Sequence, residues 1–143
     1  MGIRDAMRGK RVYFDANVVI YLIEGFPQLE RSLLEIRDSI LFAESVIVTS
    51  ELTLCEALAR PFRCEDAALV ARYRQFIEGS GAMELRTTTR DVYVRASFYR
   101  AGYSLKTPDA IHVATAVDAG CNLFVTGDNR LRTPKGIELF MLR

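Results

Sequence analysis

The sequence predicts an α/β domain in which helices cover both faces of a parallel sheet. Short apolar runs alternate with longer segments of helical periodicity, and this alternation is typical of βαβ units. The length of 143 residues fits a single domain, residues 1–143, that can bury a core without disulfides. Half of the residues are hydrophobic and 26% are charged, which is the composition of an ordinary globular protein.

The first third of the chain contains one expected strand and two expected helices. Residues 11–15 (RVYFD) are β-branched or aromatic and end on an acid, so they indicate a buried strand. The following segment keeps apolar residues on one helical face until Gly25 and Pro27 interrupt it. Apolar residues then recur at helical spacing across residues 28–42, which predicts the second helix.

The middle of the chain repeats the alternation. Residues 45–50 (SVIVTS) predict a second strand, and residues 51–60 predict a helix that ends before Pro61. A further helix is expected over residues 64–79, with a glycine at its end. Residues 83–87 then predict a third strand.

The last third supplies two more helices and two more strands. Residues 89–102 are amphipathic, and residues 108–120 begin with a proline and end with a glycine, as helices often do. Residues 122–128 (NLFVTGD) predict a fourth strand that runs into a loop. Residues 137–142 predict a last strand.

Charge and cysteine content exclude several classes of protein. The formal net charge of +1 indicates neither a nucleic-acid nor a membrane partner. Only three of the 19 basic residues are lysines, and this arginine excess fits either bidentate phosphate contacts or a GC-rich genome. The three cysteines form no CxxC motif, which suits a reducing compartment. The first apolar run is too short and polar to cross a bilayer, so we expect a cytoplasmic protein.

Two aspartates follow apolar runs that we expect to be strands. Asp15 comes after Val12–Phe14, and Asp128 comes after residues 122–127. Each has a simple structural explanation, because aspartate is a good helix cap and is common in turns such as TGDN. In parallel sheets, however, ligands bind beyond the carboxyl ends of the strands, where both aspartates are expected to lie.

Two further acids lie near expected helix starts. Glu56 borders an expected apolar stripe of Leu52, Cys55 and Ala59, whereas Glu51 suits the helix dipole of the first turn. Asp109 is preceded by a threonine and a proline that we expect at the cap and first position of a helix. Helix initiation alone would explain it.

Four carboxylates in one pocket would repel one another unless they shared protons or bound a cation. Oxygen ligands of this kind fit Mg²⁺ or Mn²⁺ rather than Zn²⁺. Such an ion can activate water and stabilise charge on a phosphoryl oxygen without a nucleophilic serine or cysteine. His112 lies three residues after Asp109, where it would either hydrogen-bond that acid or pack, and we leave it outside the catalytic set.

Four segments together resemble the successive motifs of the PIN domain, and most closely its VapC-type toxin ribonucleases. They are VYFDANVVIYL, VIVTSELTLCEAL, KTPDAIHVATAVDAG and LFVTGDNRL, which occur in the family's order and cover nearly the whole chain. The resemblance implies a three-layer α/β/α sandwich with a central parallel sheet. It also implies a metal-dependent ribonuclease, using Mg²⁺ or Mn²⁺, that forms a homodimer and is silenced by a cognate antitoxin.

The resemblance assigns residues to roles. The catalytic acids would be Asp15, Glu56, Asp109 and Asp128. Of these, Asp15 and Asp109 would be direct metal ligands, and Asp128 would join them or, like Glu56, place the attacking water or a second ion. The supporting polar residues would be Asn17, Ser50 and Thr126. Apart from the resemblance, Arg130 or Arg132 beside the site would either hold the RNA backbone or lie in a solvated loop. Many relatives carry a further acid at the position of Arg130, so a second metal ion is in question.

Two rival readings remain open at this point. A PIN fold can serve as a non-catalytic module that binds RNA or protein. The fragments YFDAN and TGDN also resemble haloacid-dehalogenase-type phosphatases, but Asn17 and Arg132 stand where that family usually has acids.

Overall fold

A computed structural model describes residues 2–143 and contains within them a five-stranded sheet of order β3-β2-β1-β4-β5. Every neighbouring pair is parallel. The strands are β1 (Arg11–Phe14), β2 (Val46–Ser50), β3 (Glu84–Arg86), β4 (Leu123–Thr126) and β5 (Glu138–Met141). Each lies within a segment that the sequence predicts as a strand, and the α/β fold with a parallel sheet is confirmed.

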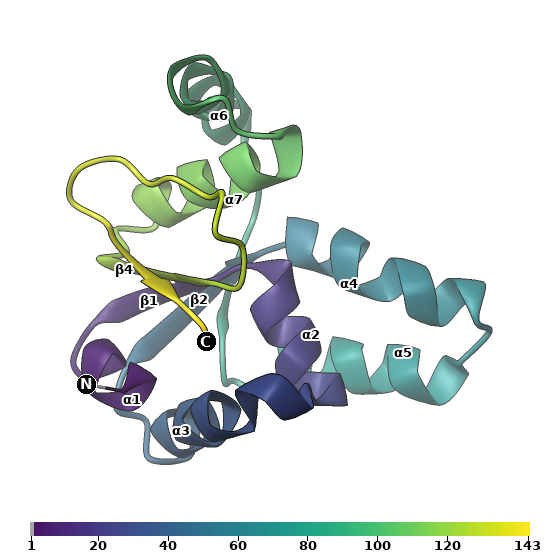
Figure 1. Ribbon diagram of the computed structural model, residues 1–143. Coiled ribbons are helices and arrows are strands. Elements are labelled where there is room, and N and C mark those ends of the chain that lie inside the picture. Colours follow the sequence, from purple (N-terminus) through teal and green to yellow (C-terminus); the bar gives the residue numbers. More distant parts are fainter. Residues whose placement is uncertain (1) are drawn as a thin grey trace.

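Helices flank both faces of this sheet (Figure 1). The first group is α1 (Ile3–Met7), α2 (Ala16–Glu24), the 3₁₀ turn η1 (Pro27–Leu29) and α3 (Glu30–Leu41). The second is α4 (Leu52–Arg63), α5 (Ala67–Arg74) and the π-helical turn η2 (Gln75–Gly79). The third is α6 (Arg90–Tyr103) and α7 (Thr107–Asp118). No helix within residues 2–143 is long and apolar enough to cross a membrane.

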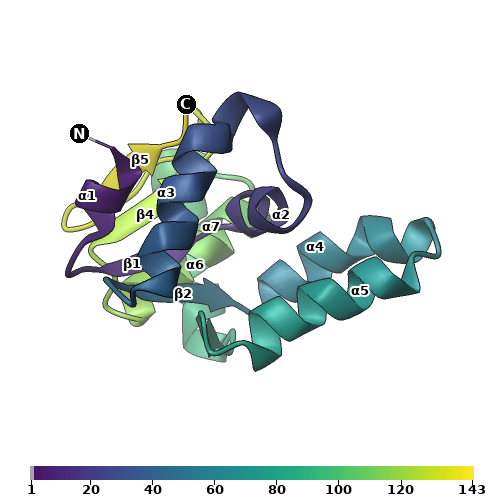
Figure 2. The ribbon, with the colours of Figure 1, turned by 90° about the horizontal axis from the view of Figure 1, so that it is seen from below.

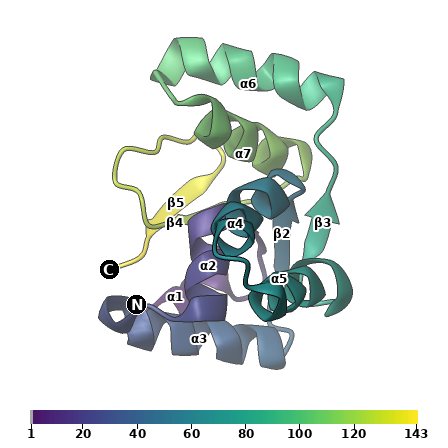
Figure 3. The same ribbon diagram turned by 90° about the vertical axis from the view of Figure 1, so that its right-hand side faces the viewer.

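Two apolar cores lie on opposite faces of the sheet because side chains alternate along each strand. Val12 and Phe14 of β1 pack with α1, α2 and α3, whereas Tyr13 packs with α6 and α7. α7 lies between the sheet and α6 (Figure 3), and all its residues from Ala110 to Ala116 are buried. Figure 2 shows that α4 and α5 form a hairpin that projects away from the sheet.

Several local predictions about α4 were wrong. The helix does not end before Pro61 but continues to Arg63, and the backbone N–H of Asp66 still donates to the Pro61 carbonyl at 2.9 Å. Its buried face is Thr53, Ala57 and Pro61 rather than Leu52, Cys55 and Ala59. The reason is that α4 packs against α2 and α5 instead of lying flat on the sheet.

Other boundaries also differ from the sequence prediction. The helix expected over residues 64–79 begins only at Ala67, where the Asp66 carboxylate accepts a hydrogen bond from the Leu69 N–H at 3.0 Å. Lys106, not Thr107, is the N-cap of α7. The short helix α1 was not predicted, and it buries Ile3, Ala6 and Met7 in the core.

Candidate active site

Asp15 and Asp128 lie at the same edge of the sheet. β1 and β4 pair directly, with Phe14 opposite Val125, so the residues that follow them leave the sheet side by side. Asp15 is the N-cap of α2, and its Oδ1 accepts a hydrogen bond from the Val18 N–H at 3.2 Å. The capping explanation is therefore correct, and it leaves Asp15 at the carboxyl edge where a ligand site is expected.

Thr126 connects the two aspartates. Its hydroxyl donates to Asp15 Oδ2 at 2.7 Å and accepts a hydrogen bond from the backbone N–H of Asp128 at 3.0 Å. Thr126 is fully buried, and only 6% of the surface of Asp15 is exposed. The last residue of β4 thus holds one oxygen of the buried carboxylate and sets the turn that carries the second acid.

Burial raises the pKa of the Asp15 carboxyl above its ordinary value, although the hydrogen bond from Thr126 offsets part of this effect. Burial also raises the pKa of the half-buried Asp109, and the negative charges of Asp128 and Glu56 raise it further. Asp15 and Asp109 repel each other as well. The negative charges of Asp15, Glu56 and Asp128 therefore all lie near Asp109 at the start of α7, and those of Asp128 and Glu56 raise its pKa.

Asp128 differs from the other aspartates because Arg130 neutralises it. The Arg130 backbone N–H donates to Asp128 Oδ1 at 2.9 Å, and this bond, followed by the guanidinium, lowers the pKa of the carboxyl. The Arg130 side chain is 72% exposed and forms an ion pair with Asp128 at 3.3 Å. Arg132 is also exposed, and it donates to the backbone carbonyl of Leu131 at 3.1 Å.

Glu56 reaches the site from the projecting hairpin through His112. The Nε2 atom of His112 lies 2.5 Å from Glu56 Oε1, and its Nδ1 atom lies 2.6 Å from the Tyr13 hydroxyl. Both ring nitrogens are therefore engaged, and the bond to Asp109 that the sequence left open is not formed. Sequence reasoning missed Tyr13 because its neighbours make it look like an ordinary core residue.

The remaining predicted residues have plainer surroundings. Ser50 is buried and its hydroxyl accepts a hydrogen bond from the Leu52 N–H at 3.1 Å, so it organises the start of α4. Asn17 is exposed in the first turn of α2. Ser50 is the last residue of β2 and Asn17 follows the end of β1 by three residues, so both lie at the carboxyl edge of the sheet.

The carboxylate oxygens are the kind of ligand that a hard divalent cation prefers, but they are not arranged in a complete coordination shell. Residues 2–143 contain no group of three or more histidine, cysteine, aspartate or glutamate side chains placed closely enough to hold a metal as they stand. The raised pKa values of Asp15 and Asp109 nevertheless mark a place where positive charge would be favourable.

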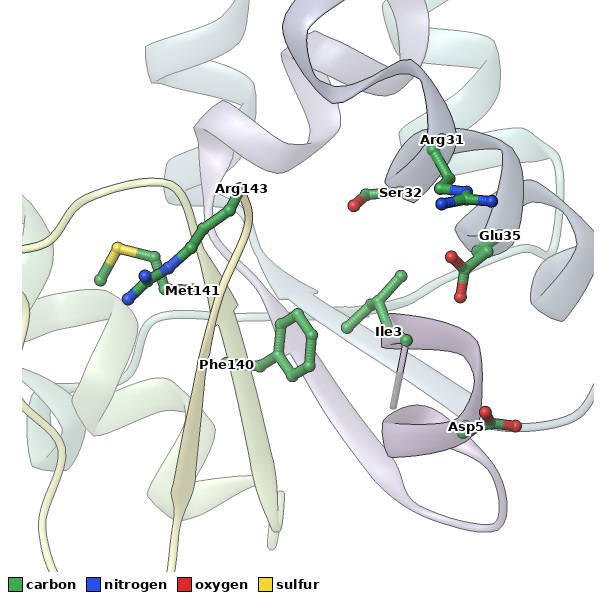
Figure 4. A pocket seen from close by; sticks show the side chains of 9 residues that line it. Ile3, Asp5, Arg31, Ser32, Glu35, Phe140, Met141 and Arg143 are labelled. Carbon is green, nitrogen blue, oxygen red and sulfur yellow. The ribbon is translucent and has the colours of Figure 1, made fainter.

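A cavity of about 700 Å³ lies elsewhere, between the N-terminal segment, α3 and the end of β5. Figure 4 shows that Ile3, Glu35 and Phe140 are among its lining side chains. None of the four acids lines it, so we do not assign the candidate chemistry to this cavity.

The sequence matches the PIN domain family over residues 12–136. No curated protein matches it by sequence. Among solved structures, VapBC2 from Rickettsia felis bound to a promoter DNA fragment has a TM-score of 0.71 at 13% identity, covering 93% of this chain and 99% of that one. DNA-bound VapBC from Salmonella typhimurium has a TM-score of 0.65 at 18% identity, covering 94% and 99%.

VapC20 from Mycobacterium tuberculosis, a sarcin–ricin loop cleaving toxin, has a TM-score of 0.62 at 18% identity, covering 79% of this chain and 86% of that one. At these identities the likeness shows a shared fold. Family membership is shown instead by the match of the sequence to the family model, which spans most of the chain.

Proposed function

Because the chain belongs to the PIN domain family, we propose that it is a metal-dependent endoribonuclease that hydrolyses RNA phosphodiester bonds in the cytoplasm. We propose further that it is the toxin of a type II toxin–antitoxin pair. The structural neighbours, which include VapBC complexes, support this proposal at the level of fold. The observation that supports the nuclease activity is the gathering of Asp128, Glu56 and the buried Asp15 around Asp109, where burial and negative charge raise the pKa values of Asp15 and Asp109.

Each acid has a distinct task in this proposal. Asp15 and Asp109 are the direct ligands of a Mg²⁺ or Mn²⁺ ion, and Asp128 completes the negative site beside them. When bound, such an ion supplies Lewis-acid stabilisation for charge that develops on the phosphoryl oxygens. Thr126 keeps the Asp15 carboxylate in one orientation through its 2.7 Å hydrogen bond.

Glu56 orients the attacking water and accepts its proton. Its side chain is 33% exposed, so it can meet water and substrate at the mouth of the site. Arg132, which is exposed beside the Asp128 turn, would hold a backbone phosphate of the RNA. Arg130 would contact RNA only by giving up part of its pairing with Asp128.

The test is cleavage of total RNA by the purified protein, with and without Mg²⁺ or Mn²⁺, followed by mapping of the cut ends. Asp15→Asn should abolish cleavage while the protein remains folded. Asp5→Asn is the matched control, since Asp5 is an exposed acid outside the site. Cleavage by Asp15→Asn would refute the assignment of the acids.

The alternative is a non-catalytic PIN module that binds RNA or protein. Thermal unfolding with added Mg²⁺ and Mn²⁺ separates the two, because an ion that binds only the folded state raises the unfolding temperature. No shift with either ion, together with intact RNA, would favour the binding module.

Toxicity and an antitoxin partner are tested in cells. Expression of the chain should arrest growth, and Asp15→Asn should relieve the arrest. Co-expression of a small DNA-binding protein encoded directly upstream should also relieve it. Arrest that persists with Asp15→Asn would separate toxicity from nuclease activity.

We also propose a homodimer that pairs α6 with its copy. Val94 and Phe98 are 65% and 72% exposed on its outer face. Asp91 and Arg95 flank them without an ion-pair partner in the described part of the chain. An antiparallel copy would bury the apolar residues and bring the opposite charges together. Phe98→Asp should therefore yield a monomer in analytical ultracentrifugation, and an unchanged mass would refute this interface.

A further inference from the structure

We propose that His112 is a positioning residue that fixes Glu56 in the catalytic site through a hydrogen-bonded chain from Tyr13 to His112 to Glu56. This inference rests on the proposed nuclease function. It adds two residues, His112 and Tyr13, that the assignment of the acids leaves without a role.

The three residues come from three different elements. Tyr13 lies in the central strand β1, His112 in α7 and Glu56 in α4. Tyr13 is fully buried and His112 is 2% exposed, and their rings meet edge to face with centroids 5.6 Å apart. The imidazole therefore has a fixed position before it meets the glutamate.

The chemistry of the end groups fixes the direction of the chain. An ionised Glu56 can only accept a hydrogen bond, so His112 Nε2 must carry the proton that lies between them. In a neutral imidazole Nδ1 is then an acceptor, and the Tyr13 hydroxyl donates to it. The buried tyrosine thus selects the tautomer of His112 that can hold Glu56.

Glu56 needs this support more than the other acids. Asp15 is held by two hydrogen bonds, and Asp128 is held by Arg130. In the described chain the only hydrogen-bond partner recorded for Glu56 is His112, and α4 projects from the sheet in a hairpin. A long, partly exposed side chain on such a helix would otherwise sample several rotamers. The hydrogen bond from His112 holds the Glu56 side chain in one of these rotamers, the one that points into the site.

The experiment is a double-mutant cycle on RNA cleavage, using the full chain. His112→Ala should lower kcat about tenfold to a hundredfold with little change in KM, as expected for a misplaced catalytic group. His112→Gln, which can still offer an N–H toward Glu56, should recover most of the loss. His112→Ala should cost little more once Glu56→Gln is present, because both changes break the same unit.

Tyr13→Phe should lower kcat less than His112→Ala does. Without the Tyr13 hydroxyl, His112 is no longer restricted to the tautomer that carries a proton on Nε2. Tyr73→Phe is the matched control for Tyr13→Phe. Tyr73 is also a buried tyrosine, but its hydroxyl donates to Glu24, which lies outside the site. Tyr73→Phe should lower stability and leave kcat unchanged. Thermal unfolding of each variant shows that the comparison is between folded proteins.

A second readout needs neither metal nor activity. In metal-free protein, ¹⁵N NMR of the single histidine should show a protonated Nε2 and an unprotonated Nδ1, and Glu56→Gln should shift the Nε2 resonance. A protonated Nδ1 with a bare Nε2 would overturn the chain. Additive losses in the cycle, or no rescue by glutamine, would overturn the positioning role alone. A wild type that fails to cleave RNA would instead overturn the proposed function.

Discussion

Replacement of Thr126 by valine would show how strongly the end of β4 stabilises the ionised Asp15. Valine has nearly the same shape as threonine, so the core around this fully buried position keeps its packing. Two hydrogen bonds are lost. One is donated to Asp15 Oδ2 at 2.7 Å, and the other is accepted from the Asp128 N–H at 3.0 Å.

The two losses differ in size. A hydrogen bond to a charged group contributes about 1.5–3 kcal/mol, and a neutral one contributes about 1 kcal/mol. The sum predicts that Thr126→Val lowers the free energy of unfolding by about 2.5–4 kcal/mol. For a domain of this size, that corresponds to a decrease of roughly 6–12 °C in the unfolding temperature.

The pH dependence of this loss has a definite sign. The Thr126 bond favours the ionised form of Asp15, whose folded-state pKa is raised by burial. The charge-dependent part of the loss is therefore full above that raised pKa and disappears as Asp15 becomes protonated at lower pH. The stability difference between wild type and Thr126→Val should increase as the pH rises through the range in which Asp15 ionises in the folded protein.

The assay is thermal and urea unfolding in metal-free buffer at several pH values, with Thr126→Ser as the control. Serine keeps the hydroxyl and removes one buried methyl group, which costs about 1 kcal/mol at any pH. If Thr126→Val lost no more than serine, or lost the same amount at every pH, the bond to Asp15 would not stabilise the charge as described.

Three further changes test other parts of the structure. Asp15→Asn should raise metal-free stability, more at high pH than at low pH, because a carboxyl whose folded-state pKa is raised destabilises the folded protein once it ionises. Unfolding curves that coincide at all pH values would contradict this. Tyr73→Phe should lower the free energy of unfolding by about 1–2 kcal/mol in urea, because the Tyr73 hydroxyl is lost as a donor to Glu24. Burial raises the pKa of the Cys121 thiol to about 12, so a thiol reagent at pH 8 should modify only the two exposed cysteines of the native protein; rapid reaction of all three would show that Cys121 is accessible.

The sheet could be predicted from the sequence because its signals are local. Residues 11–15 and 122–128 are short apolar runs followed by turn residues, and each contains a strand. The same pattern located Asp15 and Asp128 at the carboxyl edge. The buried face of α4 was predicted wrongly because it depends on packing against α2 and α5 rather than on the sheet. The local sequence pattern does not indicate which helices lie beside it.

The contacts of His112 could not be predicted for a related reason. His112 contacts Tyr13, which lies 99 positions earlier in the sequence, and Glu56, which lies 56 positions earlier. Spacing along one helix suggested Asp109 as the partner, since it lies on the same face three residues earlier. The structure shows that the imidazole instead bridges α7 to a strand and to a second helix.

The burial of Ala110–Ala116 in the middle of α7 means that the alanines of this segment set the spacing between the helix and its neighbours. Ala110, Ala114 and Ala116 are wholly buried in this helix, which lies between the sheet and α6. Since Asp109 and His112 belong to the same rigid helix, the volume of these small side chains sets how far both stand from β1. Larger residues would lift the acid and the imidazole together. The dimensions of the site are thus determined by residues that touch neither substrate nor metal.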